Sequence, residues 1–91
     1  MRNRSRLEIY LDLIRVVSKQ SDIINIGRKA NLSLGETKKH LEFLDSQGLV
    51  KAVGLDGNRP KYELTQRGLD ILEALQTLTE HGHPLLKHAL H

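Results

Sequence analysis

The segment SLGETKKHLEFLDSQGLV (residues 33–50) contains the start, the body and the end of one helix, followed by the first residues of a strand. Ser33 and Glu36 have the spacing of a capping box, in which each side chain satisfies a backbone N–H of the first turn. The helix is therefore expected to begin at Leu34. Gly48 stands where a left-handed residue ends a helix, and the two residues after it are β-prone. The segment predicts a helix that runs directly into a strand.

The expected helix has an apolar and a polar face. Thr37, Leu41 and Leu44 recur with helical spacing, so they are expected to be buried. Residues 34–47 contain two lysines against three acids, so the helix as a whole is slightly acidic. Its solvent face is expected to carry Gly35, Glu36, Lys38, Lys39 and Glu42.

The chain has 91 residues, a formal net charge of +3 and no cysteine. A single domain of this size buries only about two thirds of its unfolded surface, so oligomerisation is expected. The lack of cysteine excludes a disulfide framework and a thiolate metal site. No apolar run is long enough for a membrane helix, and the basic start lacks the apolar core of a signal peptide, so a cytoplasmic protein without a membrane partner is expected. The mildly basic charge is compatible with a polyanion partner.

Two shorter helices are expected earlier in the chain. Ser5 and Glu8 repeat the capping-box spacing, so the first should begin at Arg6. Residues 23–30 are expected to form the second, although three isoleucines leave a short strand open at its start. A tight turn joins this second helix to the next, which is the order of a helix-turn-helix. The buried stripe of the first helix is predicted to be Leu7, Tyr10, Leu11, Ile14 and Val17.

A β-hairpin is expected after the helix-turn-helix. Residues 49–53 and 61–64 are β-prone, and the connection between them contains an Asp-Gly turn signal at Asp56. Pro60 is expected to keep the tip of the connection out of the ladder.

A last helix is expected after Thr65, which has the chemistry of an N-cap. Its apolar positions are Leu69, Ile71, Leu72, Leu75 and Leu78. The order of elements predicts a mainly α fold with a β-hairpin (α+β), a winged helix-turn-helix with an additional helix. The expected parts are a basic N-terminal arm (1–5), the winged helix-turn-helix domain (6–64), the C-terminal helix (65–81) and a histidine-containing tail (82–91).

Four blocks, in this order, resemble those of the small archaeal winged-helix DNA-binding proteins that were first described as chromatin-associated. The resemblance covers residues 4–78 and implies a homodimer in which the last helices form an antiparallel coiled coil. Two features depart from the family's pattern: the hairpin connection is longer, and the last helix spans only about 15 residues, or ~22 Å. The blocks are Arg4-Ser5-Arg6-Leu7-Glu8-Ile9, Ala30-Asn31-Leu32-Ser33, Gly48-Leu49-Val50 and Tyr62-Glu63-Leu64-Thr65-Gln66-Arg67-Gly68-Leu69. The resemblance places Ile71, Leu75 and Leu78 at the dimer interface.

The solvent face of the helix that begins at Leu34 is the candidate DNA-reading surface, because a helix-turn-helix inserts the early residues of its second helix into the major groove. An ordinary solvent-exposed helix face would have the same composition. The expected β-hairpin, which forms the wing of a winged helix-turn-helix, and the family resemblance favour DNA binding over this alternative. Gly35 allows a close backbone approach. Glu36 and Glu42 either accept from cytosine or repel phosphates, so this helix is expected to select sequence more than to supply affinity.

Basic and amide side chains outside that helix are the candidate phosphate contacts. They are Arg28 and Lys29 at the end of the second helix, Asn58, Arg59 and Lys61 at the wing, and Arg2, Arg4 and Arg6 in the arm. Turn chemistry alone also explains Asn58. The arm is either a solubilising terminus or a phosphate-tracking extension. If five or six cations meet phosphates, log K should fall with log salt at a slope of about −4.5 to −5.5.

No catalytic or ligand site is expected. The tail histidines His81, His83, His88 and His91 have spacings that suit zinc or nickel, but a solvated tail is the preferred interpretation. His40 is expected to be a partly buried helix residue or a groove-facing donor. The acids have no partner at a defined spacing and no glycine-rich phosphate loop is present, so neither an enzyme nor a cofactor or small-molecule ligand is expected.

The predicted function is that of a homodimeric transcription regulator that binds double-stranded DNA in the nucleoid. An architectural DNA-binding protein with little sequence preference is the alternative within the same class. A winged helix can also serve as a protein-interaction scaffold, which would expose apolar residues on the wing and on the DNA-reading helix. Phe43 and Leu55 are the conspicuous candidates for such exposure.

Overall fold

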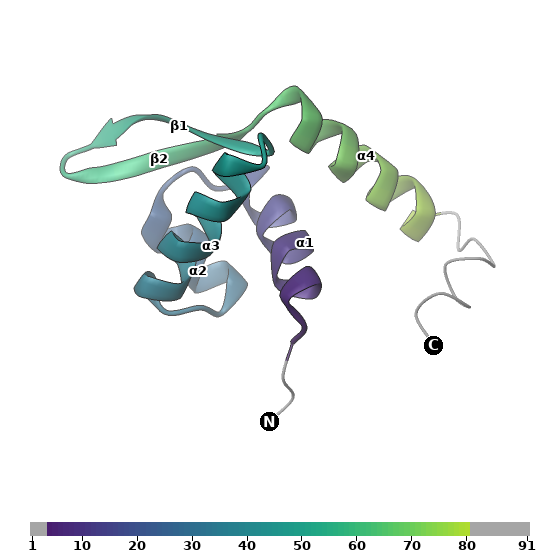
Figure 1. The fold of residues 1–91 in the computed structure, drawn as a ribbon, viewed down its shortest axis with the longest axis horizontal. Helices are drawn as coiled ribbons and strands as arrows, with labels where there is room; N and C mark the ends of the chain where they lie inside the picture. Colours follow the sequence, from purple (N-terminus) through teal and green to yellow (C-terminus); the bar gives the residue numbers. More distant parts are fainter. Residues whose placement is uncertain (1–3, 81–91) are drawn as a thin grey trace.

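Four helices and one antiparallel hairpin make up residues 4–80, the part of the chain that the computed structural model describes (Figure 1). Their order is that of a winged helix-turn-helix followed by one more helix, so the predicted α+β fold is confirmed. The elements are α1 (Arg6–Val17), α2 (Ile23–Ala30), α3 (Leu34–Ser46), β1 (Val50–Asp56), β2 (Arg59–Leu64) and α4 (Gln66–Glu80).

Side-chain caps fix the starts of α1 and α3, as the sequence predicts. The Ser5 hydroxyl accepts from the Glu8 backbone N–H and the Ser5 N–H donates to the Glu8 carboxylate, both at 3.1 Å. The Ser33 hydroxyl accepts from the Glu36 N–H at 3.2 Å. The Glu36 carboxylate differs from the prediction, because it accepts from the Ser33 hydroxyl at 3.1 Å rather than from a backbone N–H. Half of this capping box is therefore a side-chain pair.

A carboxylate cap decides the conformation of the isoleucine-rich segment. Asp22 Oδ2 accepts from the backbone N–H groups of Ile24 and Asn25 at 3.1 and 3.2 Å, so α2 begins at Ile23. The strand left open at this position does not form. Only Asp22, one residue earlier, makes an isolated β-bridge, and its partner is Lys61 in β2.

The hairpin is longer than predicted and its turn is tighter. Asp56 pairs with Arg59 and Leu55 with Pro60, so the connection is the two-residue turn Gly57-Asn58. Gly57 has φ = 67°, the positive value that a type II′ turn requires at its first central position. The prediction that Pro60 lies outside the ladder is wrong, because in a two-stranded sheet each strand is an edge strand, where proline is tolerated. Most of the connection that the sequence analysis counted as longer than the family's is therefore paired strand.

The core lies where α1, α2 and α3 meet the inner face of the hairpin. Thr37, Leu41 and Leu44 are buried as predicted. In α1 the prediction is wrong at one end: Leu7 is 65% exposed, although it shares the helical phase of buried Ile14, because no described residue covers that side of the first turn. Leu13 is fully buried instead, since α1 packs against α2, α3, β2 and α4 and so buries more than one stripe. The buried apolar residues are Leu13, Ile14, Val17, Ile23, Ile26, Ala30, Leu41, Leu44, Val50, Tyr62, Leu64 and Leu72.

The last helix starts on the hairpin and projects away from the body of the domain (Figure 1). Thr65 caps it, as predicted, by accepting from the Gly68 N–H at 3.1 Å, while its hydroxyl donates to the Gly48 carbonyl at 2.6 Å. Gly68 is buried, and a Cβ there would overlap the carbonyl oxygen of Leu49. This close contact joins the start of α4 to Leu49, which lies between α3 and β1. No helix within residues 4–80 has the length and apolar composition needed to cross a membrane.

Candidate nucleic-acid interface

The N-terminal half of α3 presents an open and positively charged surface. Gly35, Lys38 and Lys39 are exposed, and a Cβ at Gly35 would meet no atom within 4 Å. Within residues 4–80, neither lysine has an ion-pair partner. Glu36 is held by the Ser33 cap, so one of the acids predicted for this face is turned to the helix start. The first two turns therefore expose two lysines and one carboxylate, and that carboxylate is oriented toward the helix start.

A close contact between α2 and α3 sets the angle at which this surface is presented. Gly27 is buried, and a Cβ there would lie 2.6 Å from Thr37 Oγ1. Thr37 is fully buried and donates to the Ser33 carbonyl at 2.7 Å. Sequence reasoning did not identify Gly27 as part of the motif, although a glycine inside a helical pattern is a signal of close packing. The two helices of the motif approach each other at this point.

The wing is fastened to the start of α2. Arg59 Nε lies 3.4 Å from Asp22 Oδ1, and the Tyr62 N–H donates to the Ser21 carbonyl at 2.9 Å. Arg59 is still half-exposed, and Asn58 is exposed in the turn. Lys61 is partly buried. Two of the basic residues predicted for the wing therefore lie beside the helix-turn-helix rather than on a free loop.

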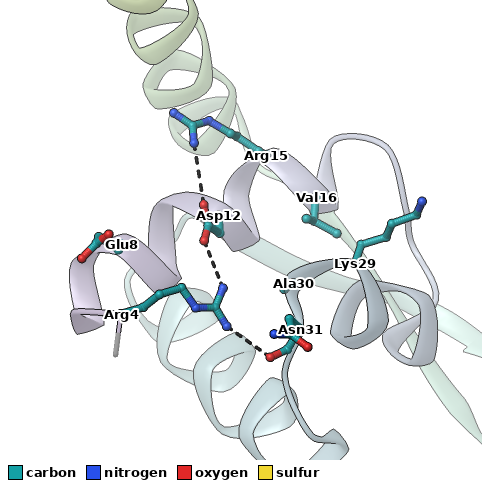
Figure 2. Close-up of a pocket in the computed structure, with 8 residues that line it drawn as sticks. All are labelled: Arg4, Glu8, Asp12, Arg15, Val16, Lys29, Ala30 and Asn31. Atoms are coloured by element: carbon teal, nitrogen blue, oxygen red, sulfur yellow. Dashed lines mark hydrogen bonds and ion pairs between the residues drawn. The ribbon is translucent and has the colours of Figure 1, made fainter. Parts of the chain in front are cut away.

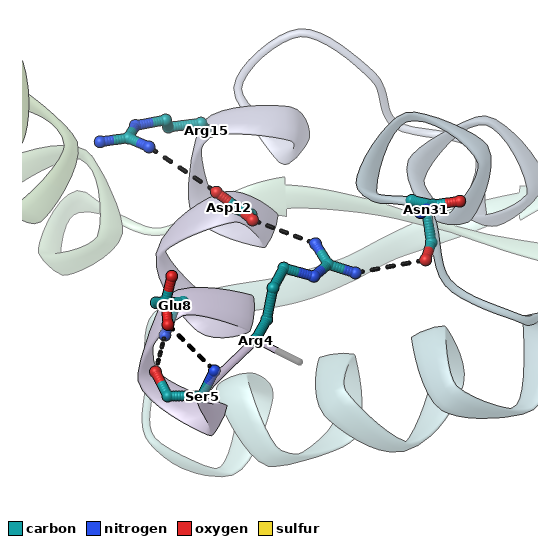
Figure 3. A network of polar contacts seen from close by, with 6 residues as sticks. All are labelled: Arg4, Ser5, Glu8, Asp12, Arg15 and Asn31. Carbon is teal, nitrogen blue, oxygen red and sulfur yellow. Dashed lines mark hydrogen bonds and ion pairs between the residues drawn. The ribbon is translucent and has the colours of Figure 1, made fainter. Parts of the chain in front are cut away.

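The N-terminal arginines have three different situations. Arg4 donates to Asp12 at 3.0 Å and to the carbonyl of Asn31 at 3.2 Å, so its guanidinium links the start of α1 to the left-handed end of α2 (Figure 3). Arg6 is exposed at the first residue of α1. Arg2 lies outside the described residues. The described part of the predicted arm is thus bound to the domain.

Arg28 and Lys29 face different parts of the surface. Lys29 lines a groove of about 630 Å³ between α1 and α2, together with Arg4, Arg15 and Asp12 (Figure 2). Arg28 instead lines a smaller hollow between α2 and the start of α3. Of the two, Arg28 is therefore the one next to the predicted DNA-reading surface, although the sequence does not distinguish them.

An aromatic cluster covers the junction of α1 and α3. Tyr10 stacks on Phe43 with ring centroids 4.9 Å apart, and His40 meets the Tyr10 ring edge-on at 5.5 Å. His40 is partly buried, which agrees with one of the two alternatives that the sequence left open. Phe43 is 43% exposed, but Leu34, Val53 and Leu55 are also exposed apolar residues of α3 and the wing. More apolar surface is exposed there than the sequence indicated.

The acidic end of α3 faces the hairpin. Burial raises the pKa of the Tyr62 hydroxyl, and the nearby carboxylates of Glu42 and Asp45 raise it further. Glu42 thus lies near Tyr62 at the base of the hairpin, one turn after Lys38 on the same side of α3. Along α3 the two lysines therefore stand between Glu36 in the first turn and the acids Glu42 and Asp45 further on.

The residues predicted for the dimer interface lie along α4. Ile71 and Leu75 are partly buried and Leu78 is 37% exposed. The tail histidines His81, His83, His88 and His91 lie outside the described residues. Within residues 4–80, no group of three or more histidine, cysteine or acidic side chains is arranged to hold a metal ion.

The order of elements, the cap of α3 and the paired wing define a winged helix-turn-helix domain. The chain belongs to the winged helix-turn-helix family, whose sequence profile matches residues 3–87. No curated protein matches the sequence.

Solved structures share the fold at low sequence identity. A protein of Ralstonia eutropha has a TM-score of 0.64 at 19% identity, with 74% of this chain and 93% of that chain covered. FabT of Streptococcus pneumoniae, solved in complex with DNA, has a TM-score of 0.73 at 15% identity over 89% of this chain. This chain spans only 57% of the FabT chain. A homodimeric winged helix-turn-helix DNA-binding domain of Mycobacterium bovis has a TM-score of 0.70 at 20% identity, with 88% of this chain and 72% of that chain covered.

Proposed function

We propose that the protein binds duplex DNA as a homodimeric transcription regulator without enzymatic activity. The observation that carries the proposal is the start of α3, where Lys38 and Lys39 are exposed beside an open backbone at Gly35. A helix-turn-helix places this part of its second helix in the major groove. FabT, which shares the fold, was solved in complex with DNA, and this supports a DNA-binding role for the fold here.

The basic face is defined here as Arg28, Lys38, Lys39, Arg59 and Lys61. These residues come from α2, α3 and β2, and the contact between Gly27 and Thr37 and the ion pair between Asp22 and Arg59 hold the three elements together. Phosphate contacts from such a face supply affinity and fix orientation, whereas base edges are read by the helix in the groove. A regulator needs both, and the two lysines combined with neutral Gly35 provide a surface that can do both.

Dimerisation through α4 is part of the proposal. Ile71, Leu75 and Leu78 share one side of a helix that projects from the domain, and the M. bovis domain with the same fold is homodimeric. Two copies related by a two-fold axis would present two recognition helices to a palindromic site.

The proposal is tested by selecting bound sequences from a random-duplex pool in the presence of competitor DNA. We expect the protein to enrich a set of sites, and the variant K38A/K39A to lose about 60-fold in affinity at 0.1 M salt, since each phosphate contact is worth about eightfold there. The matched control K19A/K29A removes the same charge from a second, smaller hollow that Lys19 and Lys29 line together, and it should bind nearly as the wild type. Retention of every duplex without enrichment would indicate an architectural protein, and no retention would overturn the proposal.

A further inference from the structure

Leu34 is an apolar side chain that does not belong to the hydrophobic core. It is the first residue of α3, directly after the Ser33 cap, and it is 54% exposed. The cap is made by Ser33, and the buried face of the helix is made by Thr37, Leu41 and Leu44. A solvent-exposed leucine at the start of the proposed DNA-reading helix is available for a contact with a ligand.

Leu34 lines a hollow of about 290 Å³ between α2 and the start of α3. Ile24 and Leu32 form apolar walls together with Leu34, and the guanidinium-bearing Arg28 stands at its border. Lys38 lies one turn further along the same side of α3, because residues four apart are neighbours on a helix. The hollow thus combines apolar walls with the cation of Arg28, and Lys38 follows on the same helix.

The major groove of DNA offers one apolar group to such a surface. Most of the groups that the base pairs present there are hydrogen-bond donors or acceptors, whereas the 5-methyl group of thymine is apolar. We propose that Leu34 reads a thymine methyl group, with Arg28 on the adjoining phosphate. This inference rests on the proposed function and adds to it a preference for thymine at the base that meets the first turn of α3.

The test compares two synthetic duplexes of equal length, alternating dA–dT and alternating dA–dU. Both carry the same hydrogen-bonding groups in the major groove, and only the first carries methyl groups. Because the sequence alternates, the protein meets the same pattern of bases wherever it binds along the duplex. We expect the wild-type protein to bind the dA–dT duplex about fourfold more tightly for each recognition helix, as one buried methyl group predicts. The variant L34A should bind both duplexes alike.

The control L7A removes a leucine that is 65% exposed in α1, outside the recognition surface, and should keep the wild-type ratio. Equal affinity of the wild-type protein for the two duplexes would overturn the thymine contact, whatever the stability of the variants. An unchanged ratio in L34A would overturn the role of Leu34. Failure to bind either duplex, or a mixed-sequence duplex, would overturn the proposed function itself, which is a different result.

Discussion

Arg59 of the wing and Asp22 at the start of α2 form an ion pair, with 3.4 Å between Nε and Oδ1. This carboxylate oxygen is buried and accepts no hydrogen bond within residues 4–80, so the arginine is its charge compensation. The other oxygen of Asp22 caps α2. A single side chain therefore starts a helix of the motif and holds the wing against it, and it also withholds part of the Arg59 charge from phosphate.

The substitution D22N tests this competition. Asparagine caps a helix as well as aspartate does, so α2 should be retained, while the ion pair and one negative charge beside the DNA are lost. We expect the affinity for duplex DNA to rise about fivefold at low salt, the equivalent of about 1 kcal/mol for a partly exposed pair. Fluorescence anisotropy with a labelled duplex measures the change. The control D70N makes the same charge change in α4. A lower affinity of D22N for duplex DNA would contradict the competition and would mean that the ion pair holds Arg59 in its binding position.

The substitution G68A should destabilise the fold. A Cβ at Gly68 would meet the backbone of Leu49 and a methyl group of Leu64, and overpacking of this kind costs about 2 kcal/mol. The same change at Gly35, where a Cβ meets nothing, should instead stabilise α3 by about 0.5–1 kcal/mol. Urea unfolding at one protein concentration compares the two variants. Similar free energies of unfolding for G68A and G35A would contradict the close packing of the start of α4 on Leu49.

The raised pKa of Tyr62 predicts a loss of stability at high pH. Burial is the main cause, and Glu42 and then Asp45 add to it. As the pH rises past about 10, the unfolded chain loses the phenolic proton while the folded protein keeps it, so stability falls between the unfolded and the folded pKa. The variant Y62F lacks this group and should lose less stability between pH 9 and pH 11. Equal losses in urea unfolding would show that Tyr62 does not titrate differently on folding.

The substitution L78E should weaken the proposed dimer. A carboxylate at this position of α4 would have to be buried against the partner helix, which costs far more than a solvent-exposed charge. We expect the dimer dissociation constant to rise at least about tenfold in sedimentation equilibrium. The control Q76E adds the same charge on another side of α4, where Gln76 is exposed, and should leave the dimer intact. A monomeric wild-type protein, or a dimer unaffected by L78E, would contradict dimerisation through this side of the helix.

The local signals in the sequence predicted most of the fold because they act within one or two turns. The caps at Ser5, Ser33 and Thr65 and the buried stripe of α3 depend on neighbours three or four residues away, and all of them are present. The strands of the hairpin were predicted too short. The Asp-Gly signal does not by itself decide whether Asp56-Gly57 or Gly57-Asn58 forms the turn, and in the structure the turn is Gly57-Asn58.

The arrangement of the site depended on pairs that are far apart in the chain. Arg4 reaches Asn31 and Arg59 reaches Asp22, and no periodicity connects such residues. The sequence therefore identified the basic residues but not which of them the fold leaves available. In the structure Arg4 and Lys29 line the groove between α1 and α2, whereas Arg28 lies beside the start of α3.

The salt dependence of duplex binding tests the central claim most directly. With five cations in the basic face, log K should fall with log salt at a slope of about −4.5 for each protomer, and K38A/K39A should reduce the magnitude of the slope by about 1.8. Affinity for duplex DNA that does not change with salt, or a slope that is the same in the wild type and in K38A/K39A, would contradict the account.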